Sequence, residues 1–386
     1  MSDLEMQLLL SSNEVDDAFG SVAPAIHQSS LFTFPTYDAL EERFSGKSEA
    51  DIYSRTSNPT VRLLEDKLAK LERGDAAIAF GSGMAAISGA VLSLVKAGDR
   101  IVSTFNTYSD AYRLFEILMA RLGVSVTYVD CNDIDELSNA LVGARLLFLE
   151  SPSSYVFETC DIKKATDVAK QHGVITIFDN SFASPLGQKP LLHGADIVVH
   201  SISKYLSGHS DVVAGCVVGS HDLINQIRDT ALPLLGAKLS AMEAWLVIRG
   251  LRTLPMRLRE HQEAADFVVG KLKDDSRIAK IHRAMPSSTL SGAGGLFTVE
   301  LADGLDVRAF CDALKVFRLG VSWGGFESLA LPASVAARID SGPNALQKFG
   351  VSRNAIRLFT GLEGREVLLA DICQALTAAE SMEKSR

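Results

Sequence analysis

The chain has 386 residues, 47% of them hydrophobic and 22% charged, so it is long enough for two domains and apolar enough to bury a large core. This composition excludes a chain that is disordered throughout. Asp and Glu (47) outnumber Lys and Arg (38), and the formal net charge of −9 argues against a nucleic-acid-binding surface. A local basic pocket for an anion is still compatible with this charge.

No C-x-x-C pair occurs among the five cysteines, which are Cys131, Cys160, Cys216, Cys311 and Cys373. The pattern predicts buried thiols in a reducing compartment, with no disulfide framework and no metal site. The apolar run Leu8–Leu10 is too short for the core of a signal peptide. Glycines and serines interrupt the most apolar stretch, 76–98, which favours a buried strand and helix over a membrane span. We therefore expect a cytoplasmic protein.

Residues 1–50 show weak periodicity and many turn formers, and they are predicted to form an N-terminal arm. A helix is predicted to follow Asn58, which can cap it, with Pro59 at its first position. The apolar side chains that share one face of this helix are Val61, Leu64, Leu68 and Leu71. Gly74 is placed to end the helix.

Short apolar runs then alternate with amphipathic stretches. The runs that predict strands are Ala76–Phe80, Ile101–Thr104, Val124–Val129, Leu146–Glu150, Val174–Asp179, Ile197–Ser201 and Val212–Val218. Several are near-continuous in Val, Ile, Leu or Phe, which is typical of strands covered by helices on both faces. We predict an α/β domain with a mostly parallel sheet over residues 51–245.

A smaller α+β domain is predicted over residues 246–386. The arginine-rich run Arg249–Arg259 leads the chain into it. Within this domain, Gly294–Leu301 is predicted as a strand and Val307–Phe317 as a helix.

Polar residues follow the predicted strands where ligands collect in a doubly wound sheet. Asp179 ends one strand, and Ser201, Ser203 and Lys204 follow the next. The run Gly81–Met84 follows the first strand and opens a helix. Three strand ends thus offer a carboxylate, a lysine with two hydroxyls, and a glycine-rich helix start.

These groups fit pyridoxal phosphate. Lys204 would form the Schiff base, and Asp179 would keep the pyridine nitrogen protonated. The phosphate would be bound by backbone N–H groups of Gly83 and Met84 and by the hydroxyls of Ser201 and Ser203. Each signal also has an ordinary interpretation, such as a solvated lysine, a tight glycine turn or an Asx-turn. The residues alone leave both interpretations open.

A series of motifs extends the pattern over nearly the whole chain: Tyr53-Ser54-Arg55, Asn58-Pro59-Thr60, Phe80–Ala86, Tyr108, Asp179–Phe182, His200–Tyr205, Gly208–Asp211, Arg249–Leu254, Ser322–Leu329, Ile356-Arg357-Leu358 and Gly361-Leu362-Glu363. In these motifs the sequence resembles the Cys/Met-metabolism family of pyridoxal-phosphate enzymes, which includes cystathionine β-lyase, γ-lyase and γ-synthase and methionine γ-lyase. The resemblance implies a type I aminotransferase-like fold with a seven-stranded, mostly parallel sheet. It also implies a homotetramer built from tight dimers.

The resemblance assigns further residues to the site. Tyr53 and Arg55 would reach the phosphate of a neighbouring subunit, so that active sites are shared across the dimer. Tyr108 would stack on the cofactor ring and assist proton transfer. Arg357 would clamp the substrate α-carboxylate bidentately, with Ser322 beside it. After the substrate amine displaces it, Lys204 would carry protons between substrate and cofactor atoms.

The motifs divide between branches of the family. Trp323 and the run Glu150–Ser154 look like bacterial cystathionine β-lyases. Ser154 stands where many γ-branch members carry an asparagine that bonds the 3-oxygen of the cofactor ring, so it is expected to contact that oxygen differently. The motifs Tyr53–Thr60 and Leu331–Ala333 look more like the γ branch.

Two departures bear on the substrate. Val321 replaces a glutamate that cystathionine γ-enzymes commonly use for a distal ammonium, which counts against cystathionine. Asp110 stands where methionine γ-lyases tend to carry a cysteine, which counts against methionine.

The expected activity is that of a carbon–sulfur lyase that eliminates a thiol from a sulfur amino acid and leaves a 2-oxo acid and ammonia. L-Cystathionine is the leading candidate substrate. The alternative is γ-replacement on an activated homoserine ester, as in a cystathionine γ-synthase or a sulfhydrylase. A non-catalytic cofactor-binding regulatory protein is a third possibility, against which the presence of Lys204, Asp179, Tyr108 and Arg357 speaks. Neither nucleic acid nor a membrane is expected as a partner.

Overall fold

The computed structural model describes Met6, Leu9 and residues 20–338 and 342–381. Helix α3 (Pro59–Glu72) leads the chain into the larger sheet. The Asn58 side chain accepts a hydrogen bond from the Thr60 N–H, and the predicted apolar face of α3 is buried, so this prediction is confirmed. Its end differs, because Arg73 adopts the left-handed conformation (φ 64°). Gly74 instead allows close packing, since a Cβ there would lie 2.6 Å from the Val218 side chain.

The larger sheet has seven strands, in agreement with the prediction. Their bounds are β1 Ala76–Phe80, β2 Arg100–Thr104, β3 Ser125–Val129, β4 Leu146–Glu150, β5 Ile175–Asp179, β6 Ile197–Ser201 and β7 Gly215–Gly219, in the order β1-β7-β6-β5-β4-β2-β3. Strand β7 is antiparallel to both neighbours, and the other neighbouring pairs are parallel. It starts three residues later than predicted because the N–H and C=O of Ala214 bond to the Ser203 side chain.

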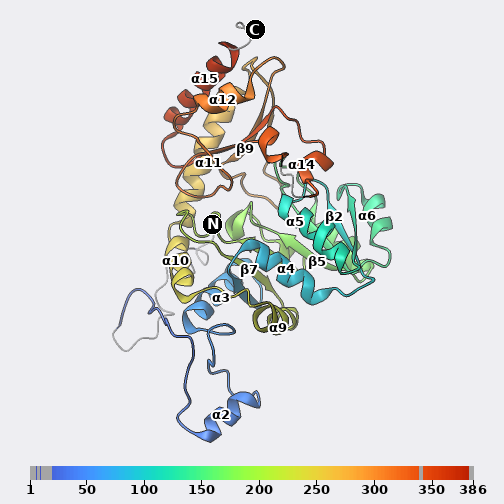
Figure 1. Cartoon of the computed structure of the whole chain (residues 1–386), viewed down its shortest axis with the longest axis vertical. Coiled ribbons are helices and arrows are strands. Elements are labelled where there is room, and N and C mark those ends of the chain that lie inside the picture. Colours follow the sequence, from blue (N-terminus) through green and yellow to red (C-terminus); the bar gives the residue numbers. More distant parts are fainter. Residues whose placement is uncertain (1–5, 7–8, 10–19, 339–341, 382–386) are drawn as a thin grey trace.

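Helices cover both faces of this sheet, and alternate strand residues point to opposite faces. Strand residues such as Phe148 and Ile177 pack with α4 (Gly83–Leu94), while Leu147 and Phe178 pack with α6 (Ile134–Leu141) and α7 (Ile162–Gln171). The other elements of this unit are α5 Ser109–Arg113, the π-helix η1 Leu114–Met119, α8 Ser184–Gly187, the 3₁₀-helix η2 Pro190–His193, α9 His221–Thr230 and the π-helix η3 Ala231–Leu235. Figure 1 shows the two helical layers around the sheet.

Two helices, α10 (Ala241–Leu251) and α11 (Leu254–Leu272), lead into a smaller C-terminal unit. Its five-stranded sheet has the order β10-β11-β12-β9-β8. The strands are β8 Ile278–His282, β9 Leu296–Leu301, β10 Arg318–Leu319, β11 Leu329–Pro332 and β12 Ala355–Phe359, and the helices are α12 Val307–Ala313, α13 Ala333–Ala336, α14 Ala345–Lys348 and α15 Arg365–Ser381. The expected α/β fold with a smaller α+β unit is therefore present.

The two elements predicted in this unit are shorter than expected. Strand β9 starts at Leu296 rather than Gly294, because the N–H of Gly295 donates to the Tyr205 hydroxyl (2.8 Å) instead of to a strand. Helix α12 ends at Ala313 because the Asp371 carboxylate accepts hydrogen bonds from the next three free N–H groups, those of residues 315–317 (2.8–3.0 Å).

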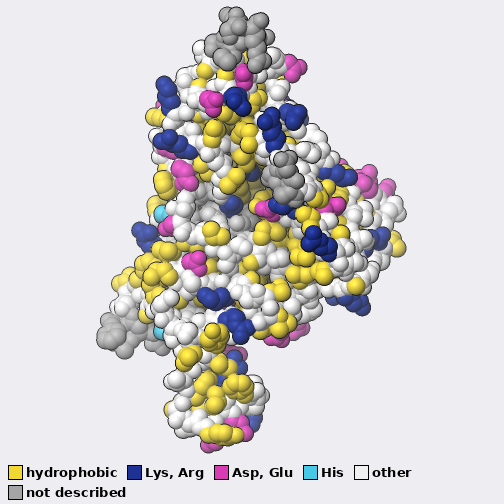
Figure 2. Space-filling model, in the orientation of Figure 1, with side chains coloured by type: hydrophobic (Ala, Val, Ile, Leu, Met, Phe, Trp, Pro, Cys, Tyr) yellow, Lys and Arg dark blue, Asp and Glu magenta, His cyan; other side chains and the backbone are white. Residues whose placement is uncertain are grey.

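The N-terminal segment 20–58 projects from the rest of the chain (Figure 1). The arm was predicted over residues 1–50, of which most of 1–19 lie outside the described residues. Within it, residues Tyr37–Phe44 form helix α2, which begins where the Thr36 side chain accepts from the Ala39 N–H (3.1 Å). None of the α2 residues is buried, and Tyr37 and Phe44 are 77% and 73% exposed. Figure 2 shows hydrophobic side chains gathered on this projection. A single chain therefore leaves apolar surface uncovered here.

All five cysteines are free, four of them buried as predicted and Cys373 partly exposed. Across the described residues, no helix is both long and apolar enough to cross a bilayer.

Candidate active site

Lys204 lies in the turn that follows β6, at the carboxyl edge of the larger sheet. Its Nζ donates to the Ser322 Oγ (2.6 Å) and lies 5.7 Å from the centre of the Trp323 ring. Burial, and then the charge of Arg357, lower the pKa of Lys204 to about 8, while Asp179 acts in the opposite direction. The lysine therefore has a substantial neutral fraction near neutral pH, as an amine nucleophile or base requires.

The loop that carries Ser322 comes from the smaller unit and is held against the lysine. Ser322 has a φ of 79°, a conformation unusual for a residue with a Cβ. Gly324 has a φ of 90°, and a Cβ there would lie 2.7 Å from the Tyr205 nitrogen. Glycine is therefore required at position 324 for the loop to approach the backbone beside Lys204.

Arg357 projects from β12 toward the same place. Its Nη2 donates to the Ser322 carbonyl oxygen (3.4 Å), and its guanidinium carbon lies 5.1 Å from the centre of the Tyr155 ring. Burial lowers the pKa of Arg357 from its ordinary value. A partly buried guanidinium with no carboxylate partner among the described residues is suited to bind a carboxylate from outside the chain.

Tyr108 directly precedes α5, and its hydroxyl is influenced by the charges of Asp110 and Arg357. Its hydroxyl donates to the Asp110 Oδ2 (3.1 Å). Burial, and then the Asp110 carboxylate, raise the pKa of Tyr108 well above its ordinary value, while the charge of Arg357 opposes this change. The Tyr108 hydroxyl is therefore bonded to Asp110 and is within the electrostatic influence of Arg357.

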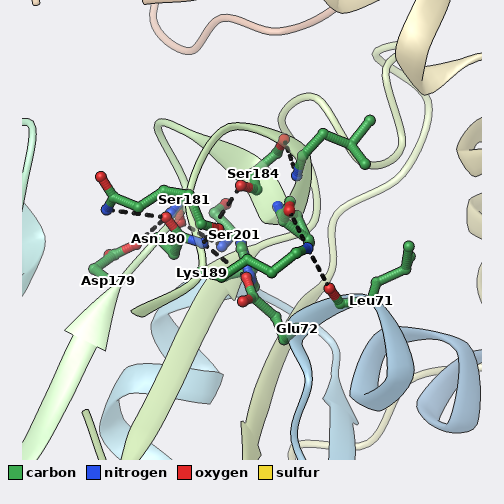
Figure 3. A network of polar contacts seen from close by, with 12 residues as sticks. Leu71, Glu72, Asp179, Asn180, Ser181, Ser184, Lys189 and Ser201 are labelled. Atoms are coloured by element: carbon green, nitrogen blue, oxygen red, sulfur yellow. Dashed lines mark hydrogen bonds and ion pairs between the residues drawn. The ribbon is translucent and has the colours of Figure 1, made fainter. Parts of the chain in front are cut away.

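Asp179 ends β5 and is almost fully buried (8% exposed). The Ser181 N–H donates to its Oδ1 (2.9 Å), and the Ser201 N–H donates to the Ser181 hydroxyl (2.7 Å), so the ends of β5 and β6 are joined (Figure 3). Burial raises the pKa of Asp179, whereas the Ser181 hydrogen bonds and the charges of His200 and Lys204 act to lower it. A cationic ring nitrogen would stabilise this buried carboxylate further.

A second polar network lies beneath Asp179. The Glu72 Oε1 accepts from the Asn180 Nδ2 (2.7 Å) and pairs with the His200 Nε2 (2.5 Å). Figure 3 shows how this network joins the end of α3 to the loop after β5. It holds the two strand ends that carry the cofactor residues.

The start of α4 provides donors for an anion. The Ser82 side chain accepts from the Ala85 N–H (3.0 Å), which leaves the N–H groups of Gly83 and Met84 at the helix end. A Cβ at position 83 would lie 2.9 Å from the Ser201 Oγ, so glycine is needed there. The Ser203 hydroxyl would have to give up its bond to the Ala214 oxygen in order to donate to a phosphate.

Glu150 is a site residue to which the sequence assigned no role of its own. It accepts hydrogen bonds from the Tyr108 N–H (2.6 Å) and from the hydroxyls of Ser154 (2.9 Å) and Thr107 (3.2 Å). Burial, and then Asp179, raise the pKa of Glu150 to about 8. The Ser154 hydroxyl proton is thus directed at Glu150, leaving its oxygen as an acceptor. The same signal that identified Asp179, a carboxylate at the end of an apolar strand, could have identified Glu150.

Tyr53 and Arg55 are not brought together with Lys204 in the chain. The Arg55 Nη1 donates to the Pro233 oxygen (2.5 Å), and its guanidinium carbon lies 5.6 Å from the centre of the Tyr53 ring. Both line a cavity of about 310 Å³. Val321 is next to Ser322 but is 74% exposed.

Comparisons with known proteins place this site in a family. Residues 6–377 match the model of the family described as Cys/Met metabolism PLP-dependent enzyme. The chain is 36% identical over 375 residues to L-methionine gamma-lyase of Pseudomonas putida, with 94% of each chain covered. It is 33% identical over 387 residues to cystathionine beta-lyase of Lactococcus lactis subsp. cremoris, covering 97% of this chain and 99% of that one.

A solved structure is similar over the same extent. It is a putative O-acetylhomoserine (thiol)-lyase from Campylobacter jejuni containing N′-pyridoxyl-lysine-5′-monophosphate, with a TM-score of 0.91, 29% identity, and coverage of 97% of this chain and 99% of that one.

The chain belongs to the Cys/Met metabolism family of pyridoxal-phosphate-dependent enzymes. It is therefore an enzyme of the carbon–sulfur lyase and synthase group, and its cofactor is pyridoxal phosphate. The residues present fit that cofactor, because the close approach at Gly83, the buried carboxylate of Asp179 and the half-buried amine of Lys204 match the needs of its phosphate, ring nitrogen and aldehyde.

Proposed function

We propose that this enzyme eliminates a thiol from a sulfur amino acid, with L-cystathionine as the leading candidate, and releases a 2-oxo acid and ammonia. The observation that carries the choice of substrate is the Asp110 carboxylate, which is bonded to the Tyr108 hydroxyl beside the Arg357 guanidinium. Pyridoxal phosphate, held by Lys204, Asp179 and the start of α4, would supply the electron sink for the bonds at the substrate Cα.

The chain's own residues would divide the work as follows. Arg357 binds the α-carboxylate of the substrate, and its partly buried position strengthens that ion pair. Lys204, held at Ser322, takes the proton from Cα and returns a proton where the thiol leaves. Asp179 would hold a proton on the ring nitrogen, because that cation would offset the cost of burying the carboxylate. Tyr108 covers the ring, and Glu150 holds its backbone in place.

Asp110 supports a substrate with a second ammonium group. Its carboxylate is about half exposed and its Oδ1 also pairs with Arg113 (3.2 Å), so Oδ2, bonded only to the neutral Tyr108 hydroxyl among the described contacts, can attract a cation. L-Cystathionine has a distal ammonium, whereas methionine has none. Asp110 thus offers a carboxylate where position 321 has only an exposed valine.

A second candidate is γ-replacement on an activated homoserine ester. It is favoured by the likeness to the putative O-acetylhomoserine (thiol)-lyase, which matches over nearly the whole chain. The same Arg357 would bind the α-carboxylate of such an ester, and a thiol would replace its leaving group.

Product analysis with L-cystathionine tests the proposal. Pyruvate with homocysteine would identify β-elimination, and cysteine with 2-oxobutyrate would identify γ-elimination. Failure to turn over cystathionine, combined with formation of cystathionine from an acylhomoserine and cysteine, would contradict the proposal in favour of the second candidate.

The role of Asp110 has its own test. Asp110→Asn keeps a hydrogen-bond acceptor for Tyr108 but removes the charge, so KM for L-cystathionine should rise about tenfold. The KM for S-methyl-L-cysteine, which has no distal ammonium, serves as the matched control and should stay within about twofold. An equal rise for both substrates would mean that Asp110 acts only on Tyr108.

The proposal extends to assembly and compartment. We expect a cytoplasmic homotetramer in which Tyr53 and Arg55 complete the site of a neighbouring chain. The support is that both residues are exposed on a segment with uncovered apolar side chains, and that the five cysteines are free.

A further inference from the structure

A large cavity lies beside the active site, at the carboxyl ends of β2, β3 and β4. Its volume is about 710 Å³, and its lining comes from both units of the chain. Asn132 and Glu158 contribute from the larger unit, and Lys348 and Phe349 from the smaller one. No step of the proposed reaction uses this space.

Two cysteines form part of its wall. Cys131 follows β3 and Cys160 precedes α7, so the two are distant in sequence. Their neighbours join the two segments, because the Asn132 Nδ2 donates to the Thr159 oxygen (3.0 Å). Both cysteines belong to one buried cluster of side chains, and their mutual interaction raises the pKa of Cys131 and lowers the pKa of Cys160. Each cysteine is 8% exposed, so both are covered by protein yet border the cavity.

The two thiols differ in character. The interaction with Cys131, and less strongly the Ser151 side chain, lower the pKa of Cys160 against the opposing effect of burial, whereas the pKa of Cys131 is raised. The Ser151 hydroxyl is itself fixed, because its oxygen accepts from the Cys160 N–H (2.9 Å). Cys160 is therefore the better nucleophile, and Cys131 stands beside it with its proton.

The cavity wall also carries an unpartnered polar atom. Thr104 is only 3% exposed, and its hydroxyl has no hydrogen-bond partner within the described structure. It lines the same cavity as the two cysteines. Together with Asn132, Glu158 and Lys348, it makes this space suitable for a small polar molecule.

We propose that Cys131 and Cys160 form a redox site, and that a small disulfide entering the cavity converts this dithiol to an intramolecular disulfide. Cys160 attacks one sulfur of the small disulfide, forms a mixed disulfide and displaces one thiol. Cys131 then attacks the Cys160 sulfur and displaces the second thiol. The protein loses two hydrogen atoms, and the small disulfide is reduced to two thiols.

Oxidised glutathione is the probe for this site. The holoenzyme is incubated with it, remaining thiols are alkylated in acid, and peptides are mapped by mass spectrometry. The expected product is a peptide pair joined through Cys131 and Cys160, with two glutathione molecules released for each chain. Two results would overturn the proposal. One is glutathione that stays attached to Cys160 in the unchanged protein. The other is that Cys131 and Cys160 both stay reduced while Cys373 reacts with oxidised glutathione.

Single variants separate the two roles. Cys131→Ser should stop the reaction at the mixed disulfide on Cys160, and Cys160→Ser should leave Cys131 reduced. Cys373→Ser, which changes the partly exposed cysteine, is the matched control and should leave ring closure unaltered. Closure at an unchanged rate in Cys160→Ser, with Cys131 joined to another cysteine, would contradict the assignment. The mapping of the unchanged protein remains decisive if either variant folds poorly.

Discussion

Lys204 and Arg55 are two cations predicted to serve the same cofactor, yet their surroundings differ completely. The lysine is half-buried, bonded to Ser322 and surrounded by side chains from both units of its own chain. Arg55 is exposed on the N-terminal segment, and its guanidinium donates to the backbone oxygen of Pro233. The difference teaches that one chain brings Lys204, Ser322 and Arg357, the proposed reacting part of the site, together by itself. The part assigned to Tyr53 and Arg55 is left open toward a neighbour.

Lys204→Ala should have the largest effect on the proposed reacting part of the site. It removes the amine proposed to hold the cofactor and to move protons, so turnover should fall by at least about 1,000-fold, and the visible absorbance of the lysine-bound cofactor should disappear. Product formation and the absorption spectrum check this. Lys273→Ala, at a surface lysine with a 66% exposed side chain, is the control. Retained turnover in the Lys204 variant would refute the assignment.

Arg357→Lys should have a smaller effect on the same part of the site, seen mainly as weaker substrate binding. A lysine keeps the charge but loses the planar fork, so KM for amino-acid substrates should rise about 100-fold with a smaller change in kcat. Steady-state kinetics measure both constants. Arg318→Lys, in an exposed edge strand of the same sheet, provides the matched control. An unchanged KM would mean that the α-carboxylate binds elsewhere.

Arg55→Ala tests the open half and should have the smallest effect, a loss of about tenfold in cofactor affinity. Mixing this variant with Lys204→Ala distinguishes a shared site from a closed one. If sites are shared, mixed dimers contain one intact site, and activity at limiting cofactor should return to about a quarter of that of the unchanged enzyme. No recovery on mixing would mean that Arg55 serves only its own chain.

Much of the reacting half could be predicted from sequence, because its residues follow buried strands. Asp179 and Lys204 stand at strand ends that the apolar runs reveal directly. The start of β7 and the end of α12 differ from the prediction. In both places a side chain distant in sequence bonds backbone groups that the local pattern assigns to the strand or helix: Ser203 bonds those near β7, and Asp371 bonds those after α12.

The position of Asp110 at the site could not be read from the sequence in the same way. Its contact with Tyr108 depends on the turn into α5, and the proximity of that pair to Arg357 depends on the packing of two units. Helix α2 was missed for a simpler reason. Its apolar residues Tyr37, Leu40 and Phe44 have helical spacing, but the pattern spans only two turns among many turn formers and marks a face that the chain itself does not bury.

The chain has two tryptophans, one next to Lys204 and the other in contact with the N-terminal segment that carries Arg55. The Trp323 ring centre lies 5.1 Å from that of Tyr205, close to the lysine, whereas the Trp245 indole N–H donates to the Pro24 oxygen in the N-terminal segment (2.9 Å). The protein therefore contains two built-in fluorophores. Emission from Trp323 should be quenched when the cofactor binds, and emission from Trp245 should follow docking of the N-terminal segment. Filling of the site and assembly can thus be watched separately, without a label.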